Sequence, residues 1–151
     1  MELADGVFIK GKVDRIDRFD GCLRIIDYKT GSLHDNEIAF TSKGDNPLSS
    51  IPGKWFQLMC YALLYLSSDG RDSPPDTLQA AIYPLRYLRS DVRTATWDGV
   101  ADLTPAMMSA FRGMLASLCC ELLDSDTPFR PTDRKERCRY CDVRYFCPEH
   151  P

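Results

Sequence analysis

Two aspartates and a lysine near the start of the chain have the residue types and spacing for metal chemistry. Asp20 and Gly21 lie between two β-prone segments, and an Asp-Gly pair in that position predicts a two-residue hairpin turn. Counted back from this turn, Asp14 faces Asp27 across the hairpin, although facing like charges are destabilising. Lys29 points to the same face as Asp27. A divalent cation that binds both carboxylates is the simplest reason for this arrangement.

The alternative is a surface hairpin with solvated charges. In favour of it, the opposite face of the hairpin would pair Asp17 with Arg24 as an ordinary ion pair. Against it, both strands are largely apolar. Their apolar residues include Val13, Ile16, Leu23, Ile25 and Ile26. Because charge clusters also occur in structural networks, the residue pattern leaves a metal site and a structural network both open.

Residues 11–17 (GKVDRID) and 25–31 (IIDYKTG) resemble the motifs of the RecB-like branch of the PD-(D/E)XK nucleases. That branch carries Gln-x-x-x-Tyr on a helix, and Gln57 and Tyr61 match it in the right order. AddB-type and CRISPR-associated relatives add a C-terminal cysteine cluster. The matching residues here are Cys138, Cys141 and Cys147.

The resemblance implies an α/β fold of the PD-(D/E)XK type, in which helices flank a mixed central sheet. It assigns Asp14 and Asp27 to a Mg²⁺ or Mn²⁺ ion, which suits hard oxygen ligands. It makes Lys29 the group that stabilises developing negative charge or orients the attacking water. Gln57 and Tyr61 would contact the substrate phosphate or the site network, and the alternative for both is a structural role.

Tyr28 lies between the aspartate and the lysine of the second motif. Its side chain points to the opposite face of the strand, where a packed aromatic ring is expected. By resemblance, its backbone carbonyl is a further metal ligand.

The C-terminal cysteines are expected to bind a 4Fe–4S cluster, because the resembling nucleases carry one there. Cys138, Cys141 and Cys147 supply three thiolates, one fewer than the usual four. In those nucleases the remaining cysteine lies upstream of the nuclease core, as does a helix that is also missing here. The alternative fourth ligand is His150, which would complete a zinc site. The sequence therefore predicts a fragment of a larger protein or a divergent one.

Composition supports one globular domain with a real core, since 44% of the 151 residues are hydrophobic. The net charge is −3 and the pI is near 5.3, so no broad basic surface exists and DNA must be held by a local patch or by protein outside this chain. No run is expected to approach the length of a membrane span. Seven cysteines, three of them clustered, favour a reducing compartment, and we expect a cytoplasmic protein.

Hydrophobic periodicity and turn residues predict the order of elements. Strands are expected at 7–17, 22–29, 78–83 and 87–97, helices at 55–66 and 106–123, a long mobile loop at 31–53 and a polar turn at 67–75. Thr104 and Pro105 would begin the second helix. Its expected core stripe is Met107, Phe111, Met114, Leu118 and Leu122. Residues 1–127 would form the nuclease core and 128–151 a cysteine-rich tail.

These features predict the metal-dependent deoxyribonuclease domain of a helicase–nuclease subunit that hydrolyses DNA phosphodiester bonds in repair or recombination, with a helicase as its partner or as a fused region. Exonuclease action is the expected mode. One alternative is a stand-alone CRISPR-associated or phage-type exonuclease. Another is an inactive nuclease fold used for DNA binding or assembly, against which the intact Asp14, Asp27 and Lys29 argue.

Overall fold

The computed structural model describes residues 1–43, 51–68, 77–86, 91–130, 132, 138–139 and 141–147. The chain divides into two compact units, Met1–Cys119 and Cys120–Pro151. The first unit contains every strand and the helix that faces the predicted metal site. The predicted boundary at residue 127 stays a prediction.

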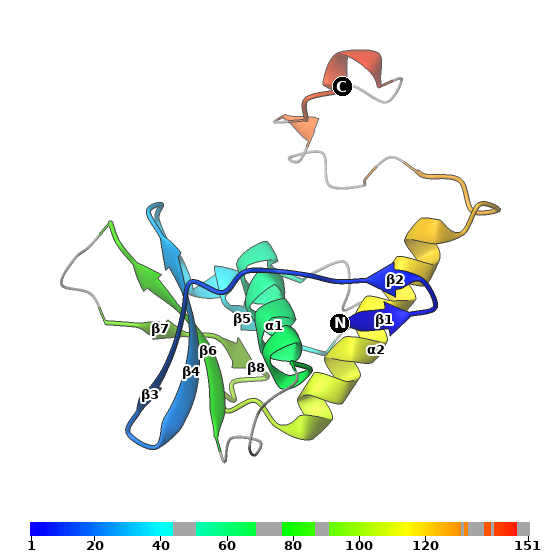
Figure 1. Cartoon of the computed structure of the whole chain (residues 1–151). Coiled ribbons are helices and arrows are strands. Elements are labelled where there is room, and N and C mark those ends of the chain that lie inside the picture. Colours follow the sequence, from blue (N-terminus) through cyan, green and yellow to red (C-terminus); the bar gives the residue numbers. More distant parts are fainter. Residues whose placement is uncertain are drawn as a thin grey trace. The chain divides into compact units, whose positions relative to one another are not determined.

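A mixed four-stranded sheet is the centre of the first unit (Figure 1). Its strands lie in the order β3 (Arg15–Phe19), β4 (Cys22–Lys29), β6 (Leu78–Pro84) and β7 (Arg93–Thr94). Strand β4 is antiparallel to β3 and parallel to β6, and β6 is antiparallel to β7. This arrangement confirms the expected α/β architecture with a mixed sheet.

The β3–β4 hairpin turns where the sequence predicts it. Asp20 and Gly21 have φ angles of 50° and 76°, and a tight hairpin turn of this kind requires positive φ at both central residues. Phe19 pairs with Cys22 next to the turn, which is the predicted register. The register is therefore fixed by the turn and carried along both strands.

Helix α1 (Gly53–Leu66) lies along one face of this sheet (Figure 1). Its buried residues recur with helical periodicity, as one apolar face requires. They are Trp55, Leu58, Met59, Ala62 and Leu63. They pack in one core with Ile25 of β4 and with Ala80 and Ile82 of β6. The expected helix over 55–66 is confirmed.

The first strand is shorter than the sequence predicts. The expected strand over 7–17 is wrong, because β1 (Glu2–Ala4) and β2 (Val7–Phe8) form a separate hairpin around Gly6, whose φ is 69°. Ile9 and Met1 exchange two backbone hydrogen bonds, at 3.0 and 3.1 Å, beside this hairpin. Residues 10–14 belong to no strand, and β3 begins only at Arg15. Within this stretch Gly11 lies close to Tyr61 and Leu64 of α1.

Two further expectations about the connections are also wrong. The loop expected over 31–53 contains a short 3₁₀ helix, η1 (Asp35–Glu37), and strand β5 (Ala39–Phe40), and Phe40 is buried against Trp55. The strand expected over 87–97 consists of β7 and a separate strand β8 (Thr96–Trp97), which pairs in parallel with β5. Pairing across distant parts of the chain leaves no local period, so the pattern missed it. Residues 44–50, 69–76 and 87–90 lie outside the described residues.

Helix α2 (Pro105–Leu123) begins as predicted, and the Thr104 hydroxyl accepts a hydrogen bond from the Met107 amide at 3.2 Å. Its core face matches the expected stripe in part, because Phe111 is buried and Met107 and Met114 pack partly buried against the core. The buried residues are Met108, Phe111 and Leu115, whereas Leu122 is 54% exposed. The Phe111 ring packs edge-on against Trp55. By length and hydropathy alone α2 resembles a membrane span, contrary to expectation, although core helices of soluble proteins pass the same test.

Candidate active site

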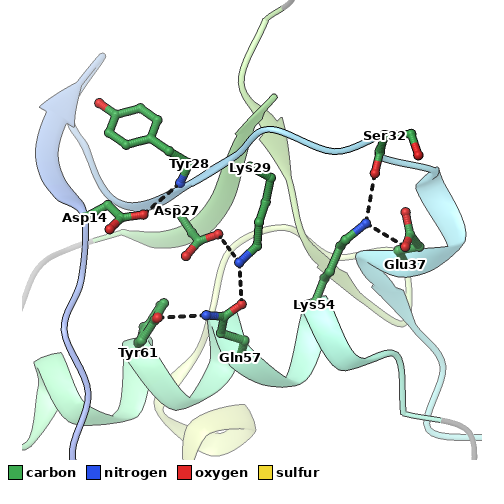
Figure 2. Close-up of polar contacts among 9 residues, drawn as sticks. All are labelled: Asp14, Asp27, Tyr28, Lys29, Ser32, Glu37, Lys54, Gln57 and Tyr61. Carbon is green, nitrogen blue, oxygen red and sulfur yellow. Dashed lines mark hydrogen bonds and ion pairs between the residues drawn. The ribbon is translucent and has the colours of Figure 1, made fainter. Parts of the chain in front are cut away.

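Asp14 and Asp27 lie at the same end of the β3–β4 hairpin (Figure 2). Arg15 pairs with Ile26, so Asp14 is one step beyond the last paired residue and takes the position opposite Asp27. Asp14 is exposed, and its Oδ2 accepts the Tyr28 amide hydrogen at 3.0 Å. Asp27 is only 4% exposed and is the buried charged residue of the described chain. The hairpin therefore brings a solvent-facing carboxylate beside a buried one.

Among the described residues, Asp27 has one charged partner. The Lys29 ammonium lies 2.8 Å from Asp27 Oδ2, yet this contact lacks hydrogen-bond geometry, and Oδ2 accepts no hydrogen bond from any described residue. The contact is therefore an ion pair with poor hydrogen-bond angles. Since burying a carboxylate is costly unless it is well paired, Asp27 retains capacity for a further positive partner.

A chain of polar contacts connects Lys29 to helix α1 (Figure 2). Lys29 Nζ donates to Gln57 Oε1 at 2.8 Å, and Gln57 Nε2 donates to the Tyr61 hydroxyl at 2.8 Å. Gln57 and Tyr61 share one helix face because they lie one turn apart. The structure thus brings all five predicted site residues, Asp14 and Asp27 included, into one region between β4 and α1.

The side chain of Tyr28 lies on the other face of the sheet from this cluster. Its ring packs edge-on against Tyr83, with ring centroids 5.9 Å apart. On that face Arg24 makes two hydrogen bonds to Asp17, at 2.9 and 3.0 Å, which is the ion pair expected from the register. On this face of β4 the Asp17–Arg24 pair is hydrogen-bonded and partly exposed. On the other face the Asp27 carboxylate is buried, and its Oδ2 accepts no hydrogen bond from the described residues.

Lys54 and Glu37 are site neighbours that the sequence analysis missed. Lys54 Nζ donates to Glu37 Oε1 at 2.6 Å and to the Ser32 carbonyl at 3.0 Å (Figure 2). The Lys54 hydrogen bond, with a second from the His34 amide, lowers the pKa of Glu37. These contacts tie the chain that leaves β4 to the start of α1. One sequence feature could have identified Lys54 as a site neighbour: it lies three residues before Gln57 and therefore on the same helix face.

Gly11 allows the chain before Asp14 to approach helix α1 closely. A Cβ atom at this position would lie 3.1 Å from Leu64 Cδ1 and 3.3 Å from Tyr61 Cε1. Both distances are tighter than ordinary van der Waals contact, so a larger residue would displace either the main chain or these side chains. Gly11 therefore affects the placement of Tyr61 and of Asp14, which follows three residues later.

The cysteines of the C-terminal unit form no ligand cluster among the described residues. Cys138, Cys141 and Cys147 are free thiols, and no group of three or more His, Cys, Asp or Glu side chains gathers in the described ranges. The Cys141 amide donates to the Cys138 carbonyl at 3.2 Å, so these two residues share a tight turn. The cluster stays a prediction, and His150 lies outside the described residues.

Cys60 is a half-buried thiol of helix α1, and burial raises its pKa to about 11.

The mixed sheet and its flanking helix make an α/β fold, with the Asp–Asp–Lys cluster at one end of its hairpin. In agreement, the model of the PD-(D/E)XK nuclease superfamily matches residues 1–148, and the chain belongs to this superfamily. Enzymes of this superfamily are nucleases that use divalent metal ions.

One relative is the Gene 69 protein of Mycobacterium phage D29, which is 25% identical over 144 residues. The match covers 95% of this chain and 44% of the phage protein, so the chain spans less than half the length of this relative. No solved structure matches the chain.

The tight packing at Gly11 predicts that Gly11→Ala lowers the free energy of unfolding by about 1–3 kcal/mol, as overpacked sites do. Gly31→Ala is the matched control, because a Cβ there meets nothing within 4 Å. Urea unfolding of both variants measures the difference. Adding Leu64→Ala to Gly11→Ala removes the closest atom and should cost less than the two single changes added together. Equal stability of the Gly11 and Gly31 variants would contradict the packing argument.

Proposed function

We propose that this chain is a divalent-metal-dependent deoxyribonuclease domain that hydrolyses phosphodiester bonds of DNA. The observation that carries the proposal is the buried Asp27 carboxylate, whose Oδ2 accepts no hydrogen bond from the described residues while Asp14 and Lys29 lie beside it. Membership of the PD-(D/E)XK superfamily supports a nuclease. The exonuclease mode belongs to the proposal.

The donor set fits Mg²⁺ or Mn²⁺. Asp14 and Asp27 would hold the ion together with the backbone carbonyl of Tyr28, and all three provide the hard oxygen ligands that these cations prefer. A bound ion would also compensate the buried charge of Asp27, which Lys29 pairs with imperfect geometry. Such an ion polarises a phosphate oxygen and lowers the pKa of a bound water molecule.

The remaining site residues would position and stabilise charge. The Lys29 ammonium is directed by two acceptors, Asp27 and the Gln57 carbonyl oxygen. The Tyr61 hydroxyl fixes which end of the Gln57 amide faces Lys29, because it accepts from the Gln57 amide nitrogen. Lys29 would thereby be held ready to stabilise the negative charge that develops on the phosphate, or to orient the attacking water.

The kind of larger protein in which this domain acts is also part of the proposal. A helicase–nuclease subunit of the AddB/RecB kind remains one setting, with a helicase as partner. The other setting is the stand-alone CRISPR-associated or phage-type exonuclease, and a phage protein more than twice the length of this chain is similar to it. The core at 1–127, the tail at 128–151 and the cytoplasmic location remain predictions.

Binding of Mn²⁺ to the native state should stabilise the chain, by about 2.7 kcal/mol at an ion concentration 100 times Kd. Asp27→Asn removes one ligand charge and should abolish most of this stabilisation. Asp102→Asn is the control, because this exposed aspartate lies outside the site and should leave the response intact. Thermal unfolding with and without Mn²⁺ provides the measurement. The same shift in Asp27→Asn as in the unmodified chain would refute the site.

Loss of the Lys29 charge should slow cleavage by about 10²-fold or more, as expected for a preorganised charge donor. Lys29→Gln should change DNA affinity little, since its role is exerted on the reacting phosphate. Lys43→Gln makes the same charge change at an exposed position and should leave the rate unaltered. Single-turnover cleavage and equilibrium binding on one oligonucleotide separate the two effects. A fall in affinity as large as the fall in rate would make Lys29 a phosphate clamp instead.

The predicted 4Fe–4S cluster at Cys138, Cys141 and Cys147 can be tested on the protein as the cell makes it, purified without oxygen. A 4Fe–4S cluster should give a brown protein with about four iron atoms per chain. Cys141→Ser should lose the iron, whereas Cys120→Ser should keep it because this cysteine lies outside the motif. A colourless protein that contains zinc would show that the cluster assignment is wrong.

A further inference from the structure

The segment that leads into Asp14 carries two lysines, Lys10 and Lys12, which are both exposed. Within the residues that the structure describes, neither ammonium group makes a hydrogen bond or an ion pair with another residue. Lys12 is only two residues from Asp14. Free positive charge therefore lies directly beside the proposed metal ligand.

Five other cations of the described chain are paired with carboxylates. The pairs are Lys29 with Asp27, Lys54 with Glu37, Arg15 and Arg24 with Asp17, and Arg93 with Asp35. A cation held by a carboxylate is less available to a phosphate, because the two anions compete for it. Lys10 and Lys12 have no such competitor in the described part of the chain.

The packing of this segment directs both lysines toward solvent. Ile9 and Val13 pack against the hydrophobic core, and Gly11 lies against helix α1. These alternate positions face the protein, so Lys10 and Lys12 lie between them on the outer side. In an extended chain, alternate residues are about 6.6 Å apart, which sets the spacing of the two charges. Figure 1 shows the segment running from β2 across α1 before it enters β3.

We propose that Lys10 and Lys12 form a phosphate-binding strip that holds the backbone of a DNA strand beside Asp14. The inference rests on the proposed nuclease function and adds the surface that would hold the substrate. The chain has a net charge of −3, so attraction to a polyanion must come from a local cluster of unpaired cations. This strip supplies such a cluster next to the site where the reaction would occur.

The experiment measures binding of a single-stranded DNA oligonucleotide in EDTA, over a range of salt concentrations. Each phosphate contact to a single strand contributes about 0.7 to the slope of log K against log salt. The double variant Lys10→Gln with Lys12→Gln should therefore reduce the steepness of the slope by about 1.4. Replacing both lysines by arginine should preserve the slope, because the charge is retained.

The matched control is Arg18→Gln with Lys43→Gln, which removes two exposed positive charges elsewhere and should leave the slope unchanged. An unchanged slope in the Lys10 and Lys12 variant, an equal loss in the control, or no DNA binding by the unmodified chain would each overturn the strip. Failure of the nuclease proposal would look different. In that case the Lys10 and Lys12 variant would still lose salt dependence, yet the unmodified chain would not cut the bound DNA when Mn²⁺ is added.

Discussion

The burial of one carboxylate governs the arrangement of this site. Strand β4 places Leu23 and Ile25 in the core, and Asp27 continues along the same face at a depth where an isolated charge is unfavourable. Lys29 is the charged partner that the strand itself supplies, and its contact is an ion pair without good hydrogen-bond angles. A buried ion pair of this kind adds little to the stability of the fold, so its presence points to a functional role of Asp27 and Lys29.

The surrounding elements serve to hold this carboxylate and its neighbours. The Asp20–Gly21 turn fixes the register that sets Asp14 opposite Asp27. Helix α1 buries an apolar face against the sheet and presents the half-buried Gln57 to Lys29. The site is thus assembled from a hairpin and one helix within the first compact unit. The chain belongs to the PD-(D/E)XK nuclease superfamily, whose enzymes use divalent metal ions.

The features predicted from sequence are those encoded by local rules. The turn residues set the hairpin register, and the spacing of Gln57 and Tyr61 placed both on one helix face. Other contacts join distant positions: Lys54 binds Glu37 across 17 residues, and Phe40 meets Trp97 through the β5–β8 pairing. No periodic pattern reports such pairs. The contact of Phe111 in α2 with Trp55 of α1 likewise joins residues far apart in the chain.

The central claim is that Asp14 and Asp27 together hold a divalent cation. Anomalous diffraction from crystals of the chain grown with Mn²⁺ tests it most directly, because the signal locates the metal itself. The account predicts an anomalous peak coordinated by carboxylate oxygens of both residues, with Lys29 still in contact with Gln57. Peaks only at other surface carboxylates, with Asp27 paired to Lys29 alone, would contradict it.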